Sequence, residues 1–497
     1  MKQYLCMRTL LLSAIAIIAV SFIIMYESGW ALSVNGAGTI FPPNRIGGAS
    51  GYNNARDADV YPAIAYDPAT GRYLAVWLTP RNAQSSSAGF DVYGVFLDRT
   101  GRAIGNEFRI SDMNTVARNG PPAVAAGNGE FAVVWTVRGT SCQLYVQRVT
   151  DASSRSDRAL ISGTGHRHSP SMVYNPVRRR YVVVYVEGDD YLPPTFFGAE
   201  TADCGNNPSS TSRIKAMEFY FSGDSPVVGS SINISDGNTG AFRPRLAYSP
   251  RLNQYLVAWE DRRNASGQAY RFDVYAQRLG NDLTITERDI PLATGGDYTN
   301  YDTSATWTPR PAVAGGDNGF LVAWFDRHVE DNAVIWSVKG RLVPASGTAG
   351  SPFTITEMPF AQSHTGQSPT GFLAATYLST AQEYLIGMTS HLESLWGYKP
   401  FALVQRVSNN GQLLKMDGTP QTSPGVGYFV DYENEDQITI AIAANPIGGI
   451  GVADYMVAYG KHSKNKPGQD YDIYSVRIQI PALYLKNVYL PLVCKGR

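Results

Sequence analysis

One pattern recurs along this chain and limits the possible folds more than any other feature of the sequence. Each copy begins with a proline and a short apolar stretch, passes through a turn, and ends in an apolar run that closes on an aromatic residue. Five clear copies span residues 61–77, 122–135, 170–185, 244–259 and 311–324, and two weaker ones begin near Pro369 and Ile438. Such a repeat is typical of architectures in which similar units stack on one another.

Two further runs complete each unit. The third run is clearest at 273–279, as Asp-Val-Tyr-Ala-Gln-Arg-Leu, and its relatives lie at 91–96, 144–149, 403–407 and 472–477. A short fourth run follows at 108–111, 232–235 and 353–356. The first two runs are almost wholly apolar, which predicts strands buried on both faces. The Gln, Arg and Asp residues of the third and fourth runs predict strands with one wetter side.

The composition agrees with an all-β protein. Among 497 residues there are 48 glycines, 29 prolines and 30 tyrosines, a mixture of turn formers and strand formers. Repeated four-stranded units with the most apolar strand innermost predict a β-propeller, because each blade then covers the flank of its neighbour. We therefore expect seven four-stranded antiparallel blades; six or eight follow if the weak units are counted differently.

The two ends of the repeat region predict how the ring closes. The seventh unit shows three strands and ends near Ile478, and an extra strand precedes the first unit at about 41–46. We expect this N-terminal segment to complete the last blade, because an unpaired edge strand is an aggregation hazard. The alternative is that the C-terminal tail fills the same position.

The N-terminus predicts export. Lys2 and Arg8 precede an apolar run at 9–25, and Gly29 and Ala31 provide a small-x-small site, which together describe a signal peptide over 1–31. The alternative is an uncleaved signal anchor, since a run of about 17 residues is near the lower limit for spanning a bilayer. The membrane is expected as a partner only through this segment. The propeller is then expected over 38–478, with a tail at 479–497.

The strings Trp-Glu-Asp-Arg at 259–262 and Asp-Val-Tyr-Ala-Gln-Arg at 273–278 resemble a repeat of uncharacterised exported bacterial β-propeller proteins. The resemblance covers about 40–478, although the third unit lacks Asp-Val-Tyr and the sixth has Met388 in place of the aromatic. It implies a secreted protein or one on the bacterial cell surface, and it implies no settled activity. The end of the tail at 488–493 resembles tails of exported proteins and is either a retention signal or a docking strand.

Several functional classes find no support in the sequence. The net charge is zero, so the chain lacks the basic balance of nucleic-acid-binding proteins. The histidines, including His166 and His168, do not follow a metal-ligand spacing. There is no phosphate-binding or dinucleotide motif, so no cofactor is expected, and the sialidase-type Asp box Ser-x-Asp-x-Gly-x-x-Trp is absent.

Polar residues at equivalent repeat positions mark one face of the expected ring as the candidate site. Arg243 and Arg310 come just before the inner-strand proline, whereas other charged residues follow the second strand: Asp261, Arg262, Asp326, Arg327 and Glu187. Arginines at a channel mouth favour an acidic sugar or another carboxylate, because the guanidinium grips planar anions at two points. The alternative is that the Asp-Arg pairs are ion pairs that fix loop geometry. A glycosidase would need two of these carboxylates around one bond, and we assign no catalytic residue.

Four cysteines are present, of which Cys142 and Cys204 fall in loops of adjacent units on that same face. In an exported chain we expect a disulfide between them, although two free thiols are the alternative. The sequence as a whole predicts a propeller that binds a glycan or a surface protein without catalysis. A glycan-active hydrolase, sialidase-like or arabinanase-like, and a structural envelope protein are the alternatives.

Overall fold

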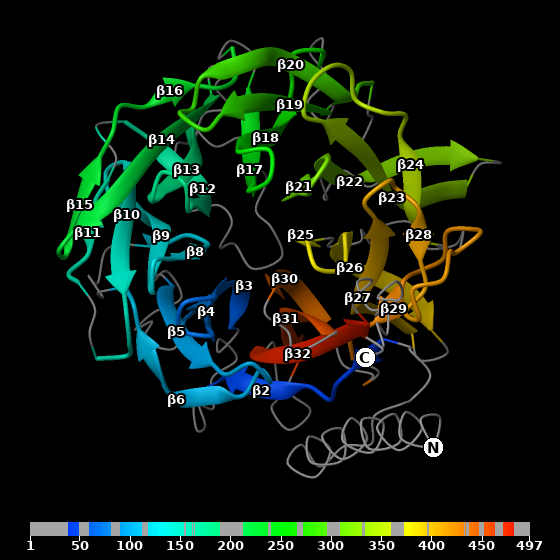
Figure 1. Ribbon diagram of the computed structural model, residues 1–497, viewed down its shortest axis with the longest axis horizontal. Helices are drawn as coiled ribbons and strands as arrows, with labels where there is room; N and C mark the ends of the chain where they lie inside the picture. The colour runs from blue at the N-terminus through cyan, green and yellow to red at the C-terminus, as the bar shows by residue number, and fades with distance from the viewer. Residues whose placement is uncertain are drawn as a thin grey trace, which may run out of the picture.

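Seven antiparallel sheets stand around a central axis, so the protein is a seven-bladed β-propeller, as the repeat predicts (Figure 1). The computed structural model describes residues 38–48, 59–80, 90–111, 118–153, 156–161, 163, 165–188, 212–236, 240–265, 272–295, 309–330, 333–358, 372–394, 397–431, 433, 437–446, 452–462 and 471–481. No helix within these ranges is long and apolar enough to span a membrane. The expected signal peptide at 1–31 and the part of the expected tail beyond Pro481 lie outside the described residues.

Each blade begins with an inner strand beside the axis and continues with a second strand antiparallel to it. The inner strands are β3 (Val60–Asp67), β8 (Ala123–Gly127), β12 (Arg167–Asn175), β17 (Ala241–Ser249), β21 (Ala312–Gly315), β25 (Leu373–Leu378) and β30 (Gln437–Asn445). The second strands are β4 (Arg72–Thr79), β9 (Glu130–Arg138), β13 (Arg180–Glu187), β18 (Gln254–Asp261), β22 (Gly319–Glu330), β26 (Glu383–Ser394) and β31 (Val452–His462). A short strand, β7 (Arg118–Asn119), also pairs with β9.

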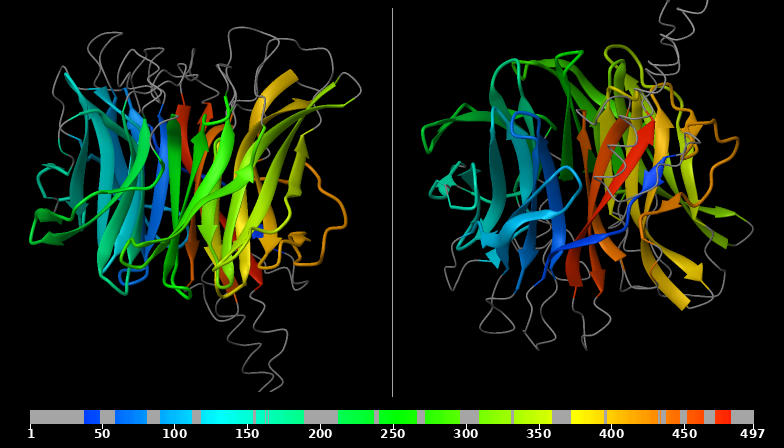
Figure 2. Two further views of the ribbon diagram at one scale, coloured as in Figure 1. Left: turned by 90° about the horizontal axis from the view of Figure 1, so that it is seen from above. Right: turned by 60° about the horizontal axis from the view of Figure 1, so that its bottom comes forward.

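The third and fourth strands complete the blades toward the rim. The third strands are β5 (Asp91–Leu97), β10 (Cys142–Val149), β14 (Arg213–Ser222), β19 (Asp273–Gly280), β23 (Ala333–Pro344), β27 (Gly397–Ser408) and β32 (Tyr471–Pro481). The outermost strands are β6 (Ala103–Arg109), β11 (Ala159–Leu160), β15 (Ser225–Val228), β16 (Ile232–Asn233), β20 (Ile285–Ala293), β24 (Phe353–Met358), β28 (Leu413–Leu414) and β29 (Tyr428–Phe429). Figure 2 shows the strands of neighbouring blades running side by side between the two faces of the disc.

The N-terminal strands close the ring, which confirms the prediction made from the orphan segment. β1 (Thr39–Ile40) and β2 (Asn44–Gly47) both pair antiparallel with β32, and Figure 1 shows β2 alongside it. Arg45 Nε lies 2.9 Å from a carboxylate oxygen of Asp472, which adds an ion pair to the ladder. The first and last described segments of the chain therefore share one blade.

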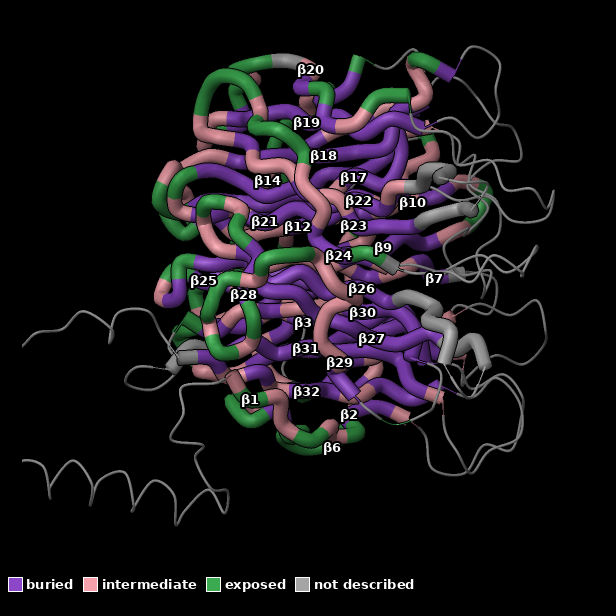
Figure 3. The backbone as a smooth tube through the Cα atoms, turned by 90° about the vertical axis from the view of Figure 1, so that its right-hand side faces the viewer, coloured by how far each residue is buried: buried purple, intermediate pink, exposed green. Residues whose placement is uncertain are grey.

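A hydrophobic core fills the space between each pair of adjacent blades. Ile64, Val133, Val183, Val257 and Val322 lie in five different cores, each on the side that faces the preceding blade. The four valines occupy one repeat position on the second strands, whereas Ile64 lies on the inner strand β3, opposite Ala75 at that position of β4. Exposed residues concentrate on the outer strands and turns (Figure 3). The exposed large apolar side chains of β6, β11 and β15 are Ile104, Leu160, Val227 and Val228.

The prediction of a wetter third strand holds for β10 and β14, in which buried and partly exposed residues alternate, and is wrong for β19. Asp273, Gln277 and Arg278 of β19 are all buried, and so are Gln405 and Arg406 of β27. The reason is that each of these side chains has hydrogen-bonding partners. The Asp273 carboxylate accepts a hydrogen bond of 2.7 Å from the backbone N–H of Gly295, whereas the Gln and Arg side chains donate to backbone carbonyls. The Gln405 amide donates to Leu414 O of the fourth strand at 2.9 Å, and Arg278 donates to Pro344 O of the next blade at 2.8 Å. Buried polar groups are tolerated when such partners are supplied.

Candidate functional site

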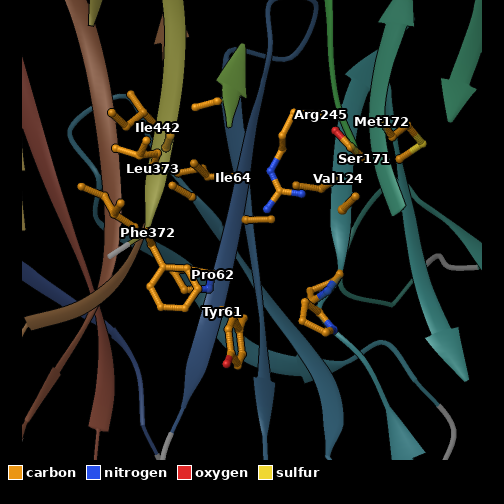
Figure 4. A pocket seen from close by; sticks show the side chains of 18 of the residues that line it. Tyr61, Pro62, Ile64, Val124, Ser171, Met172, Arg245, Phe372, Leu373 and Ile442 are labelled. Atoms are coloured by element: carbon orange, nitrogen blue, oxygen red, sulfur yellow. The ribbon is translucent and has the colours of Figure 1, made fainter. Parts of the chain in front are cut away.

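The inner strands all run in the same direction, so their first residues surround one mouth of the central channel. A cavity of about 290 Å³ lies there, and every blade contributes to its wall. Its lining includes Tyr61, Val124, Ser171, Arg245, Val313, Phe372 and Ile442. This is the face on which the sequence predicts a site. Figure 4 shows the Arg245 side chain extending into the space between the inner strands.

Five of the seven blades hold a residue in the left-handed backbone region at this mouth. These residues lie at one repeat position near the start of the inner strand, and four of them precede a proline. Their φ angles are 55° for Tyr61, 55° for Ser169, 46° for Arg243, 45° for Arg310 and 48° for Thr439. The strand register shifts at this point in β3, β12, β17 and β30, as in a β-bulge. Such a conformation costs a bulky residue on the order of 1–3 kcal/mol, and strain of this kind concentrates at functional sites.

Arg243 lies in the cavity wall and is held by a buried carboxylate. It is 7% exposed, and its Nη1 lies 3.2 Å from Glu260 Oε2, while Glu260 itself is fully buried. The other oxygen of Glu260 accepts a hydrogen bond of 2.7 Å from the backbone N–H of Arg310. Glu260 therefore fixes the mouths of the fourth and fifth blades relative to each other.

Arg310 belongs to the same ring of bulges without lining the cavity itself. Its guanidinium lies 4.6 Å from the ring centroid of Phe372, a cation–π contact between the fifth and sixth blades. Phe372 in turn meets Tyr61 edge to face, with 5.5 Å between the ring centroids. The cavity consequently has one aromatic end, formed by Tyr61 and Phe372, at the bottom of the view in Figure 4.

Arg245 lines the cavity, although the repeat pattern did not single it out. Its Nη1 lies 3.1 Å from Pro244 O. It follows the inner-strand proline, where other blades carry the small residues Ala63, Ala123, Ser171 and Ala312. A large cation at a position otherwise kept small is the signal that identifies it.

Asp261 is a structural residue of its blade. It is buried and accepts hydrogen bonds of 2.8 Å from Trp259 Nε1 and from Arg263 Nη2. Arg263 also binds Asp289 at 2.9 Å, and this favours the interpretation of an ion pair that fixes the loop, with Arg263 as the partner in place of Arg262. The Arg262 guanidinium lies 6.0 Å from the ring centroid of Phe272. Neither Asp261 nor Arg262 lines the cavity.

Asp326 and Glu187 also lie away from the cavity wall. Asp326 and Arg327 were expected in a loop, but β22 continues through both and pairs them with Ser337 and Trp336 of β23. The Arg327 side chain lies outside the described part of the structure. Glu187 ends β13 and binds Arg167 at 2.8 Å and Lys215 at 3.2 Å. Its position therefore also fits a loop-fixing ion pair.

Cys142 lies beside one of the two histidine candidates. Cys142 is in a disulfide, while Cys204 lies outside the described residues, so their pairing stays a prediction. The backbone N–H of Cys142 donates to His166 Nδ1 at 3.3 Å, and His168 Nε2 lies 3.2 Å from Gly188 O. Within the described residues, no three His, Cys, Asp or Glu side chains gather in a metal-binding arrangement.

The cavity carries net positive charge. Among the described residues that line it, Arg243 and Arg245 are charged and none is a carboxylate. Glu260 offsets the charge of Arg243 from behind the wall. The arrangement suits an anion that is small enough for about 290 Å³, near the lower end of small-molecule sites.

No protein-family model and no curated protein sequence matches this chain. Solved structures resemble it in fold at very low identity. A sialidase of Trypanosoma rangeli aligns with 90% of this chain at 8% identity and a TM-score of 0.45, and this chain covers 60% of that sialidase. The Hadza microbial sialidase Hz136 aligns with 70% of this chain at 10% identity and a TM-score of 0.40, and this chain covers 66% of that sialidase. An alpha-L-arabinofuranosidase of Lactobacillus brevis aligns with 64% of this chain at 11% identity and a TM-score of 0.36, and this chain covers 97% of that enzyme.

Proposed function

We propose that this chain is an exported glycan-binding propeller that takes a carboxylate-bearing sugar into the cavity at the channel mouth. The observation that carries the proposal is the cavity wall itself, in which two arginines are the charged groups among the described residues. An arginine binds a carboxylate through two parallel hydrogen bonds, a geometry that suits a uronic or sialic acid.

The rest of the wall suits the body of a sugar. Tyr61 and Phe372 offer aromatic surface at one end, while Ser169 and Thr439 are polar residues of the wall. The bulge at each of the last two positions places the residue in the left-handed region at the mouth. The site is therefore built before a ligand arrives, which lowers the entropy cost of binding.

Binding without catalysis fits the positions of the carboxylates better than hydrolysis does. A glycosidase places two carboxyl groups on either side of the scissile bond. Asp261 is committed to Arg263 and Trp259, and Glu187 to Arg167 and Lys215, and neither lines the cavity. Export and retention at the cell surface belong to the same proposal, supported by the apolar N-terminal segment.

The test is a binding titration of the mature chain with the methyl glycosides of glucuronic acid and N-acetylneuraminic acid. We expect at least one to bind, and Arg245→Ala to weaken that binding by about tenfold to a hundredfold, because charge-assisted hydrogen bonds are lost. Arg102→Ala is the matched control, since Arg102 is exposed on the turn between β5 and β6.

Three other results of this titration would contradict the proposal. If neither acidic glycoside binds, the proposal is wrong and a structural role is favoured. If Arg245→Ala and Arg102→Ala bind equally well, the ligand lies elsewhere on the propeller. Release of methanol or of free sugar during the titration would establish the hydrolase alternative instead.

A further inference from the structure

A second cavity opens at the opposite mouth of the channel, where the inner strands end. Its volume is about 530 Å³, and six of the seven blades contribute to its wall. It shares with the first cavity five residues at one repeat position, namely Ile64, Leu246, Val313, Ala375 and Ile442. These five residues form an apolar belt at mid-height of the channel, along which the two cavities adjoin.

Tyrosines at one repeat position dominate this second cavity. Tyr66, Tyr248 and Tyr377 come from the first, fourth and sixth blades. Each packs against the tyrosine that faces it on the second strand, with ring centroids 4.7 to 4.9 Å apart. The Tyr248 hydroxyl also donates to Asn253 Oδ1 at 2.7 Å. The aromatic wall is therefore fixed in orientation before any ligand enters.

The polar groups of this wall differ from those of the first cavity. Among the described lining residues, Arg251 and Asp317 are the charged ones, so the wall has one positive and one negative charge. They lie in the inner turns of two adjacent blades, and the hydroxyl side chains of Thr376 and Ser379 come from the next blade. Donors and acceptors are thus both present around the tyrosines.

From these observations we propose that the second mouth binds the neutral terminal pyranose of a glycan. A pyranose presents an apolar C–H face that packs on an aromatic ring, and its hydroxyls both donate and accept hydrogen bonds. Asp317 supplies an acceptor and Arg251 supplies donors, and their opposite charges match a ligand without net charge. This inference does not depend on the acidic-sugar site at the other face.

The shape of the wall favours a chain end over an extended peptide. A proline-rich peptide also packs on tyrosines, but it lies along a groove that is open at both ends. Here the wall comes from inner strands on several sides of the axis, and the apolar belt lies behind it. Such a mouth admits the last residue of a chain, which for a glycan is a single sugar ring.

The test is saturation-transfer NMR of the full chain with the methyl pyranosides of glucose, galactose and mannose. We expect at least one to bind, and Tyr377→Ala to weaken it by about threefold to tenfold through lost stacking. Arg251→Ala, an exposed turn variant that leaves the core intact, should weaken it by about tenfold. Tyr220→Ala on β14 is the matched control and should bind as the unmodified chain does.

Cross-testing separates this proposal from the first. Arg245→Ala should leave binding of the neutral pyranosides unchanged, and Arg251→Ala should leave binding of the acidic glycosides unchanged. The inference is overturned if none of the three pyranosides binds, or if neither Tyr377→Ala nor Arg251→Ala weakens the binding. Binding of acetylated hexaproline in place of the pyranosides would overturn it as well.

Discussion

Single side chains tie neighbouring blades together at one repeated position. The tyrosine near the start of the second strand reaches back to the preceding blade: Tyr181 donates to Gly127 O at 3.3 Å, and Tyr384 donates to Gly319 O at 3.3 Å. Tyr255 accepts a hydrogen bond of 2.6 Å from the Asn175 amide. In the third, fourth and sixth blades this tyrosine therefore has a hydrogen-bonding role in addition to its packing role.

Replacing one of these tyrosines tests the link directly. Tyr255→Phe keeps the ring but leaves the buried Asn175 amide without this partner, so we expect the free energy of unfolding to fall by about 1–3 kcal/mol. Tyr220→Phe, on the partly exposed face of β14, should change it by less than about 0.5 kcal/mol. Urea denaturation of the two variants measures the difference, and equal stabilities would contradict the assigned role.

Single residues also show where the repeat pattern predicted the site and where it did not. Arg243 was predicted because it recurs with Arg310 before the inner-strand proline, and it does line the cavity. Arg245 and the tyrosines of the second mouth were not predicted, since a side chain's direction at a bulge or strand end is set by φ and by neighbouring blades. A repeat pattern identifies equivalent positions but does not say which of them face the axis.

At the scale of the strand, β2 is the element on which ring closure depends. Ile46 of β2 is 4% exposed and packs in the core between the last and first blades, whereas the Arg45 side chain is 40% exposed. Pairing of β2 with β32 also covers an edge that would otherwise be free to pair with another chain. Burial of Ile46 should therefore contribute more to closure than the ion pair does.

Two substitutions in β2 separate these contributions. Ile46→Ala removes buried apolar volume and should lower the free energy of unfolding by about 2–4 kcal/mol. Arg45→Ala removes a partly exposed ion pair with Asp472 and should lower it by less than about 1 kcal/mol. Guanidinium denaturation gives both values. A larger effect for Arg45→Ala would show that the ion pair is the main closure contact.

Strand assignments followed the apolar runs well wherever the strand lies inside a blade. They failed for β22 and β26, which extend through Glu330 and Ser394, beyond the apolar runs that predicted them. The extensions pair with the equally long β23 and β27. The apolar run that predicted β22 ends before Asp326, so Asp326 and Arg327 were expected in a loop, whereas the backbone pairing with β23 continues through both.

At the scale of the whole molecule, seven similar interblade cores follow one another around a closed ring. Each core is built mainly from side chains of two adjacent blades, and two of the cores also include residues of a third blade, so no blade buries its apolar faces alone. This is why the number of blades and their strand order could be predicted from repeat spacing. The ligand sites could not, because they arise at the axis, where residues from blades far apart in the sequence meet.

The buried tyrosines give the ring a characteristic response to alkaline pH. Burial raises the pKa of Tyr255 to about 12, and it also raises the pKa values of Tyr73, Tyr181, Tyr384 and Tyr459 above the ordinary value for tyrosine. The folded chain then holds these protons more tightly than the unfolded chain does. As the pH rises above about 10, the unfolded state loses them first, and the free energy of unfolding must fall.

Absorbance of the ionised phenol during a pH titration measures this effect. At about pH 11, the native chain should show far fewer ionised tyrosines than the chain in denaturant, where most of the 30 are ionised. With further alkali the remaining tyrosines should ionise together as the ring unfolds, because each core depends on both of its blades. If the native chain ionised nearly all of its tyrosines independently near pH 10, the burial of these tyrosines between the blades would be contradicted.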